Sequence, residues 1–261
     1  DHGAQFFTVR DARFQGYVDA WLDAGVIREW FRHLPEDSNP EGYPRYCGIK
    51  GMSDIPKFLA QSLSSHQGEQ VVELVKELDY WTARTQNGGQ YCGRHLIVTI
   101  PLPQATSLLE TSGINWAGHA SKALKAIHYE KGLATLAILN GPSGVDSPGG
   151  IKVDKAPLSW IGDNLQKGIS KDVSAVTIHA TPEFAESYWD TSDEERGALI
   201  LDAAKAYLSS EVLEFTCHRW AFTTPINPWP EASFHNFDIQ LSLAGDAFGG
   251  PRVAGAALSG L

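Results

Sequence analysis

The sequence of 261 residues is 43% hydrophobic, 10% aromatic and 20% charged. This is the composition of a folded globular protein, and it excludes a disordered or collagen-like chain. The 21 Lys and Arg residues against 31 Asp and Glu residues give a formal net charge of −10. Binding to nucleic acid or to an anionic membrane needs clustered cations, so we expect neither partner, and no apolar run is long enough to span a bilayer.

The three cysteines, Cys47, Cys92 and Cys217, are widely spaced and form no C-x-x-C motif. An odd number of scattered thiols indicates a reducing compartment and not a disulfide framework. The chain opens at Asp1 with no recognisable signal-peptide pattern. We therefore expect a cytoplasmic protein.

The first elements in chain order are helical. Apolar residues at steps of three and four predict an amphipathic helix over residues 11–30. Residues 34–44 are rich in Pro, Asn and Gly and predict a loop. Ser53 is the expected N-cap of a second helix, which tolerates Pro56 in its first turn.

Strand patterns follow. Residues 71–85 are β-like, and Asn87-Gly88-Gly89 has the residues of a tight turn. Residues 95–100 form a continuous apolar run that ends before Pro101. Such a run is typical of a strand buried on both faces.

The second half mixes both patterns. Residues 116–129 predict a helix, and Ser192 with Glu195 forms a capping box that opens another helix running to about residue 210. Strands are expected at 133–139, 174–180, 216–223 and 239–244, and a helix of small residues at 253–261. The fold class is therefore α/β or mixed α+β.

Several kinds of site find no support. No two His residues have a compact metal-ligand spacing, so we expect no metal. Ser143 lies in G-P-S-G-V, which lacks the second glycine of G-x-S-x-G. Cys217 and His218 are adjacent on a predicted strand, so their side chains point to opposite faces and cannot pair as nucleophile and base. Neither a P-loop nor a G-x-G-x-x-G motif occurs.

The C-terminal segment carries the strongest signal. A buried strand is expected to end at Gly245-Asp246, followed by a glycine-rich loop and the start of a helix. The first amides of a helix point outward with a partial positive charge, and Gly255 with its small neighbours lets a flat ligand approach. Asp246 can accept hydrogen bonds from ligand hydroxyls. The alternative is a strand, turn and helix packed through small residues without a ligand.

This ending, LAGDAFGGPRVAGAALSGL, resembles the flavin motif of the flavin-containing amine oxidase superfamily, and specifically of the renalase-like FAD/NAD(P)-binding oxidoreductases. Other segments resemble the same family in the same order. They are DHGAQFFT at 1–8, GMSDIP at 51–56, VTIPLPQA at 98–105, LSWIGDN at 158–164, IHA at 178–180 and HRW at 218–220. The resemblance covers nearly the whole chain.

The resemblance implies FAD as the cofactor and two domains between which the chain crosses several times. An FAD-binding Rossmann-like domain, incomplete here, would be interleaved with an antiparallel-sheet substrate domain. The FAD-binding domain would comprise residues 1–10, 48–105 and 236–261, and the substrate domain residues 11–47 and 106–235. Family members begin with about sixty further residues that hold the FAD pyrophosphate on a G-x-G-x-x-G helix start. We therefore expect this chain to be a fragment of a longer protein, with weak or no FAD affinity alone.

The resemblance also implies where the ligands lie. Asp246, after Gly245, would bond the ribityl chain, and amides near Val253, Gly255 and Ala256 would face the flavin pyrimidine edge. The remaining cofactor contacts would come from Gly3, Ala4 and Gln5 beside the flavin, Val71 near the adenine and Pro101 at a strand end. His179, His218 and Trp220 would face the substrate, and no catalytic acid or base is assigned.

The implied reaction passes a hydride from a small substrate, a dihydronicotinamide or an amine, to flavin N5. NAD(P)H is thus a candidate partner, and O₂ is the common final acceptor. One alternative is a non-catalytic scaffold or interaction domain that keeps the fold without flavin. A further alternative, a cytoplasmic hydrolase using Ser143 or Cys217, depends on isolated residues.

Overall fold

The computed structural model describes residues 1–34, 39 and 41–261. Part of the loop predicted at 34–44 therefore lies outside the described residues. The chain forms two compact units, each built from two segments. Unit 1 comprises Asp1–Gln61 and Glu130–Thr223, and unit 2 comprises Ser62–Tyr129 and Thr224–Leu261. The chain therefore passes from one unit to the other more than once. The predicted division into an FAD-binding domain and a substrate domain stays a prediction.

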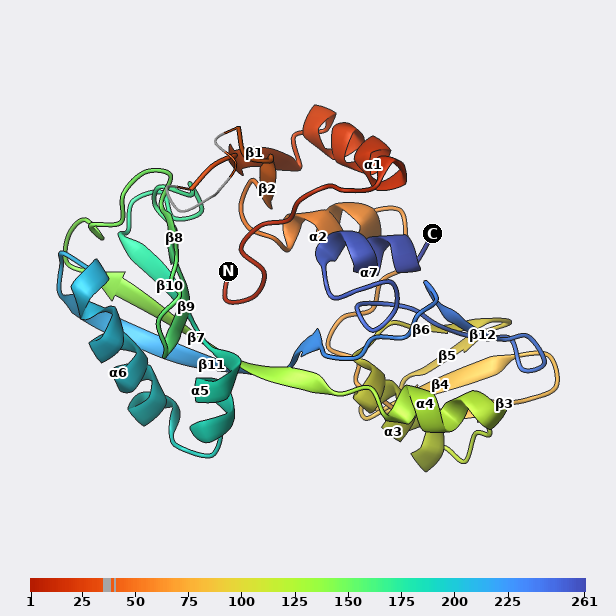
Figure 1. Ribbon diagram of the computed structural model, residues 1–261. Coiled ribbons are helices and arrows are strands. Elements are labelled where there is room, and N and C mark those ends of the chain that lie inside the picture. Colours follow the sequence, from red (N-terminus) through yellow and green to blue (C-terminus); the bar gives the residue numbers. More distant parts are fainter. Residues whose placement is uncertain (35–38, 40) are drawn as a thin grey trace. The chain divides into compact units, whose positions relative to one another are not determined.

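Unit 1 combines a five-stranded sheet with helices and a small hairpin (Figure 1). Its helices are α1 (Ala12–Asp23), α2 (Asp54–Ala60), α5 (Pro182–Ser187) and α6 (Asp193–Ala204), with a 3-10 turn η2 (Lys205–Tyr207). Its strands are β1 (Ile27–Phe31), β2 (Arg45–Gly48), β8 (Gly150–Lys152), β9 (Leu158–Asp163), β10 (Ala175–Ala180) and most of β7 (Tyr129–Leu139) and β11 (Val212–Pro225). The first residue of β7 and the last two residues of β11 belong to unit 2.

The five-stranded sheet has two different faces. Its strand order is β11-β7-β10-β9-β8, with antiparallel pairing of β10 to β7 and β9 and of β8 to β9. Helix α6 covers one face, where Ile161, Ile178 and Ile200 are completely buried (Figure 1). Side chains alternate along a strand, so Thr177 and His179 of β10 point to the other face. Thr177 there donates to the carbonyl of Asp1, which places the N-terminal segment on that face.

Helix α1 is shorter than its sequence pattern predicts. Asp11 caps it by accepting a hydrogen bond from the Arg13 amide, and Phe14, Val18 and Trp21 form its buried stripe. The prediction of a helix over 11–30 is wrong beyond Asp23. Gly25 has a left-handed φ of 65°, and the next residues form β1, which pairs antiparallel with β2. Pairing with β2 thus makes residues 27–31 a strand, although their local periodicity continues the helical pattern.

Two glycines at α1 predict opposite effects of one substitution. Gly16 lies inside the helix, and a Cβ built there meets nothing within 4 Å. We expect Gly16→Ala to raise the free energy of unfolding by about 1 kcal/mol, because alanine loses less backbone entropy in a helix. Gly25→Ala is the matched control and should lower the free energy of unfolding, because φ of 65° is unfavourable for alanine. Denaturant unfolding of both variants measures the difference, and equal effects would contradict it.

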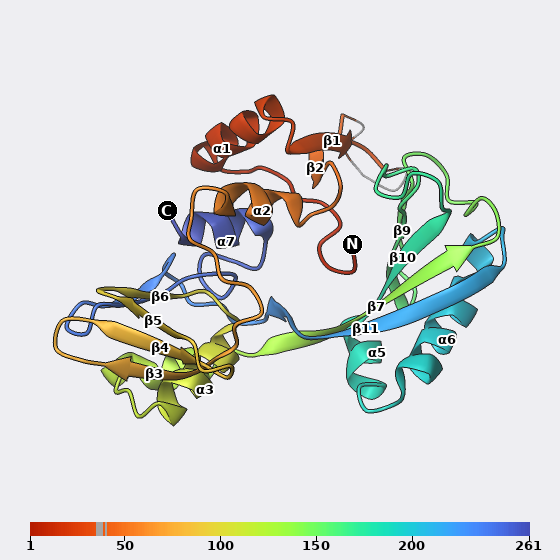
Figure 2. The same cartoon turned by 180° about the vertical axis from the view of Figure 1, so that it is seen from behind.

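Unit 2 contains two three-stranded sheets and short helices (Figure 2). Its strands are β3 (Val71–Lys76), β4 (Trp81–Thr85), β5 (Gln90–Gly93), β6 (Leu96–Val98), β12 (Phe234–Asn236) and β13 (Leu241–Leu243). Its helices are α3 (Leu102–Thr111), α4 (Ser121–Lys125) and α7 (Val253–Ser259), with the 3-10 turn η1 (Gly118–Ala120). The predicted turn at 87–89 joins β4 to β5, which confirms that hairpin. The mixed fold class and the antiparallel sheets are confirmed.

The strand predicted at 95–100 is only partly correct. Strand β6 is limited to three residues and lies at the edge of the sheet β12-β13-β6, paired parallel with β13. Strand β13 is buried along its whole length, whereas Ile97 of β6 is 64% exposed. Burial on both faces therefore belongs to the middle strand and not to β6.

Three helix predictions need correction at their ends. Within residues 116–129 only η1 and α4 are helical, and Tyr129 already belongs to β7. Ser192 caps α6 through the Glu195 amide as predicted, but the α-helix ends at Ala204 and not near residue 210. Ser53 occupies the N-cap position of α2 without a capping hydrogen bond from its side chain. Among the described helices, none has both the length and the apolar character needed to cross a bilayer.

Candidate active site

Two strand ends meet in unit 2. Because β6 and β13 run parallel, the segments that follow them leave the sheet at the same edge. The Ala244 amide donates there to the Val98 carbonyl at 3.1 Å. Pro101 follows β6 as the N-cap of α3, and Gly245 and Asp246 follow β13. The structure therefore brings these three predicted residues to one edge, where ligands of open sheets commonly bind.

The carboxylate of Asp246 is held by a tyrosine. The Tyr129 hydroxyl donates to Asp246 Oδ1 at 2.7 Å and accepts from the Leu102 amide at 3.5 Å. Burial raises the pKa of Tyr129, and its hydrogen bond to Asp246 raises it further, so the phenol keeps its proton. This hydrogen bond uses only Oδ1 of the Asp246 carboxylate.

The start of α7 offers backbone donors. The amides of Val253, Ala254 and Gly255 have no backbone partner among the described residues, as expected for the first turn of a helix. The amide of Ala256, by contrast, donates to the Arg252 carbonyl at 2.8 Å, and its predicted place facing the flavin stays a prediction. The donors at this end are therefore the three residues that precede it.

The glycines around α7 serve the protein's own packing. A Cβ on Gly255 would lie 2.3 Å from the Gly250 carbonyl oxygen, so the absence of a side chain allows the loop before α7 to contact the helix. Gly245 has φ of 132°, and its amide donates to the buried Ser259 hydroxyl at 2.8 Å. These contacts fix the loop between β13 and α7 from both sides.

Val71 belongs to the other sheet of unit 2 and not to the sheet that contains β6 and β13. It begins β3, pairs with Thr85 of β4 and packs against the core of the unit. Its predicted place near an adenine stays a prediction.

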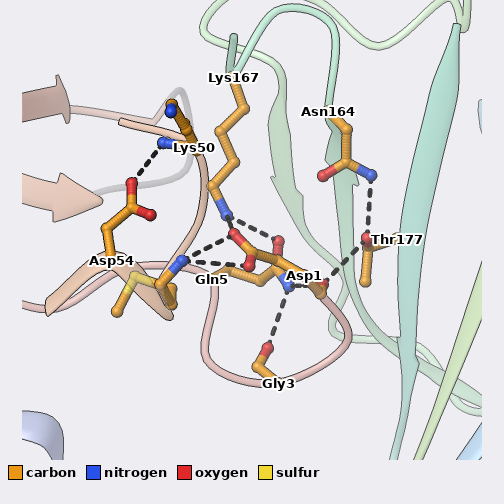
Figure 3. Close-up of polar contacts among 9 residues, drawn as sticks. Asp1, Gly3, Gln5, Lys50, Asp54, Asn164, Lys167 and Thr177 are labelled. Carbon is orange, nitrogen blue, oxygen red and sulfur yellow. Dashed lines mark hydrogen bonds and ion pairs between the residues drawn. The ribbon is translucent and has the colours of Figure 1, made fainter. Parts of the chain in front are cut away.

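The predicted flavin-side residues of unit 1 lie in its N-terminal segment. Gln5 is buried, and its Nε2 donates to the carbonyls of Asp1 at 2.7 Å and Gly3 at 3.0 Å (Figure 3). Its Oε1 accepts from Lys167 Nζ at 3.2 Å. The Gln5 side chain thus holds the loop together, while Ala4 is exposed.

Lys167 is a buried charged residue, in contact with Gln5, that sequence reasoning missed. Its side chain is 0% exposed, and its ammonium lies 3.4 Å from Asp1 Oδ2 (Figure 3). It also lies 4.9 Å from the centre of the Trp30 ring. Burial lowers the pKa of Lys167 to about 8, with a further lowering from Arg28. A lysine in a polar turn gives no sequence signal of this kind, because only the tertiary fold buries it.

The three residues predicted to face the substrate gather around His2. The His2 ring stacks on His218 with centroids 4.3 Å apart and lies 5.1 Å from Trp220. The Trp220 indole donates to the His2 carbonyl at 3.3 Å. The backbone of His2 also acts on His179, whose pKa it raises against the larger lowering caused by burial. One backbone segment thereby brings together side chains from β10 and β11.

Two buried donor or acceptor atoms beside this cluster lack a partner. His179 Nε2 and Trp160 Nε1 have no hydrogen bond among the described residues, and the two residues are direct neighbours across β10 and β9. Burial lowers the pKa of His179 to about 4, so the ring is neutral near pH 7. Burial also lowers the pKa of His2, with His218 adding to the effect. Unpaired buried polar atoms are uncommon and are satisfied when a ligand or water binds.

The residues of the hydrolase alternative lie in structural positions. Ser143 is 2% exposed, and its hydroxyl donates to Asp163. Cys217 is buried in the core under α6, and burial raises the pKa of its thiol. Neither residue has the histidine base and the access that a nucleophile needs.

Comparison with known proteins identifies the family. The family described as flavin containing amine oxidoreductase matches residues 15–260. Three solved structures share the fold. A proposed protoporphyrinogen oxidase from Exiguobacterium sp. 255-15 is 15% identical with a TM-score of 0.60, over 83% of this chain and 50% of that one. An oxidoreductase from Methanosarcina mazei is 16% identical with a TM-score of 0.58, over 94% and 66%. Cyclohexylamine oxidase from Brevibacterium oxydans is 11% identical with a TM-score of 0.55, over 84% and 52%.

This chain thus spans about half the length of two of these proteins and 66% of the other. The family match covers nearly all of its residues and agrees with the flavin cofactor and the oxidoreductase class expected from the sequence. The chain belongs to the family of flavin-containing amine oxidoreductases.

Proposed function

We propose that this chain forms part of an FAD-dependent oxidoreductase that oxidises a small molecule. The observation that carries the proposal is the strand edge of unit 2, where Asp246 lies beside a tyrosine donor within a flavin-family chain. The substrate classes that we propose are an amine or, as in the renalase-like branch, a dihydronicotinamide such as NAD(P)H.

The groups at this edge fit the cofactor in their chemistry. The free oxygen of Asp246 suits a ribityl hydroxyl, which is a hydrogen-bond donor. The amides at the start of α7 that have no backbone partner in the described part of the chain suit a flavin edge, whose oxygen and nitrogen atoms accept hydrogen bonds. Pro101 and Gly245 would present only backbone and small surfaces to the cofactor. These features support binding of the flavin part of FAD.

The cluster around His2 supports a substrate-facing role for His179, His218 and Trp220. Trp220 and His218 offer flat aromatic surfaces, which suit a planar or cationic substrate. Neutral His179 and the Trp160 indole offer polar atoms that have no hydrogen bond within the described ranges. These groups would bind and orient a substrate.

FAD, when bound, supplies the acceptor for a hydride. The protein's own residues need only position the substrate and exclude water, so no acid or base is assigned. His179 stays neutral at working pH and is therefore suited to hydrogen bonding and not to charge stabilisation.

Flavin binding to the purified protein tests the proposal. A visible absorption spectrum with two flavin bands, released on denaturation, is expected for the longest polypeptide that carries this chain, with its intact mass confirmed. The 261-residue chain alone should bind FAD weakly, because it contains no G-x-G-x-x-G motif. A protein that stays colourless with added FAD in both forms would favour the scaffold alternative.

Replacing the carboxylate provides a sharper measurement. We expect Asp246→Ala to raise the dissociation constant for FAD about tenfold or more, because a hydrogen bond to a charged group is lost. Asp238→Ala is the control, since Asp238 is exposed in the same unit. Flavin fluorescence titration compares the two, and equal affinities would contradict the role of Asp246.

A further inference from the structure

One hydroxyl group in unit 2 joins two segments that lie far apart in sequence. Tyr129 OH donates to Asp246 Oδ1 at 2.7 Å across 117 positions of sequence, and it accepts from the amide of Leu102 at 3.5 Å. Leu102 is the first residue of α3, directly after Pro101. The same phenol therefore contacts both of the chain segments that leave the parallel strands.

The direction of the shorter hydrogen bond is fixed. A carboxylate only accepts, and a phenol has one proton, so Tyr129 is the donor to Asp246. Burial and the neighbouring carboxylate both raise the pKa of Tyr129, which keeps it a donor at any working pH. Tyr129 is thus unsuited to proton transfer and suited to holding a carboxylate in place.

This hydrogen bond fixes the orientation of the Asp246 side chain. An aspartate side chain turns about two bonds, and a half-buried carboxylate without a partner populates several rotamers. With Oδ1 bound to Tyr129, the second oxygen keeps one direction. A group that is already oriented loses less entropy when a ligand binds, which strengthens binding without a new contact.

We propose that Tyr129 is a positioning residue of the cofactor site, which orients Asp246 for the ribityl hydroxyls and fixes the start of α3 beside it. The inference depends on the proposed flavin function. It assigns to Tyr129 no contact with FAD.

A double-mutant cycle tests this role through FAD binding alone. Tyr129→Phe removes only the hydroxyl, and we expect the FAD dissociation constant to rise about fivefold. In the Asp246→Ala background, Tyr129→Phe should have no further effect, because the group that it orients is absent. Tyr91→Phe is the matched control, since Tyr91 lies on β5 of the same unit, and it should leave the affinity unchanged.

The possible outcomes separate this inference from the proposed function. If the longest polypeptide that carries this chain binds no FAD, both are overturned. Wild-type protein that binds FAD, with a Tyr129→Phe effect that is absent or that adds fully to Asp246→Ala, overturns the positioning role alone. A purely structural role would lower the melting temperature and give additive effects.

A second measurement does not require the phenylalanine variant to fold. In protein labelled with 13C at the tyrosine ring carbon that bears the oxygen, FAD should shift the Tyr129 resonance in the wild type. The shift should be lost in Asp246→Ala, because Asp246 connects the phenol to the cofactor. A Tyr129 resonance that ignores saturating FAD in the wild type would contradict the proposal.

Discussion

Arg196→Met should lower the free energy of unfolding of unit 1 by about 3–5 kcal/mol. The Arg196 side chain is 1% exposed although it carries a charge. Its Nη1 donates to the carbonyl oxygens of Trp189 at 2.9 Å and Thr191 at 2.6 Å, and its Nη2 pairs with Asp193. Methionine fills a similar volume but donates nothing, so the turn between α5 and α6 would keep buried acceptors without donors.

The control for this substitution removes the positive charge of another arginine in the same unit. Arg219 lies 5.5 Å from the Trp189 ring but is 46% exposed, so Arg219→Met should cost about 1 kcal/mol or less. Urea unfolding followed by circular dichroism measures both variants. Equal and small losses would show that water replaces the lost donors and that the buried network contributes little.

Central strands are the part of this fold that the sequence predicts well. The patterns at 133–139 and 174–180 are found in β7 and β10, which lie side by side within the five-stranded sheet. Both strands bury one face under α6, so their apolar residues satisfy local propensity and tertiary packing at once. Agreement between the two levels is the reason that such segments are predictable.

The errors occur where a distant partner decides the structure. Residues 27–31 continue a helical pattern but form a strand, because β2 offers hydrogen bonds to them. Tyr129 ends a predicted helix but begins β7. Ile97 has the sequence of a core strand and the position of an edge. Periodicity within ten residues contains no information on such pairings.

The candidate site shows the same limit. His179, His218 and Trp220 were each expected near the substrate, and the structure adds that His2 joins them. Two further residues of the candidate positions, one in each unit, have no sequence signal. Tyr129 and Lys167 are ordinary residues until burial sets their pKa values and partners.

Burial of Lys167 predicts that the free energy of unfolding depends on pH. Comparison of the wild type with Lys167→Met measures the contribution of this side chain. The control is Lys171→Met, because Lys171 is exposed and follows in the same loop region. We expect the control to follow the wild-type curve. Taking the difference between wild type and Lys167→Met cancels the titration of the tyrosines that both proteins share. Cys47 interacts with Lys167, so its titration contributes to the difference.

In the folded state burial lowers the pKa of Lys167 from 10.5 to about 8. Below pH 8 both the folded and the unfolded chain hold this proton, so the cost of a buried ammonium is present in full. Between pH 8 and 10.5 the unfolded chain binds more protons, so the free energy of unfolding must rise with pH. The wild type should gain about 3 kcal/mol across this interval relative to Lys167→Met. A difference that is flat with pH would mean that the Asp1 carboxylate and Gln5 compensate fully for burial, and that the ammonium stays charged throughout the range.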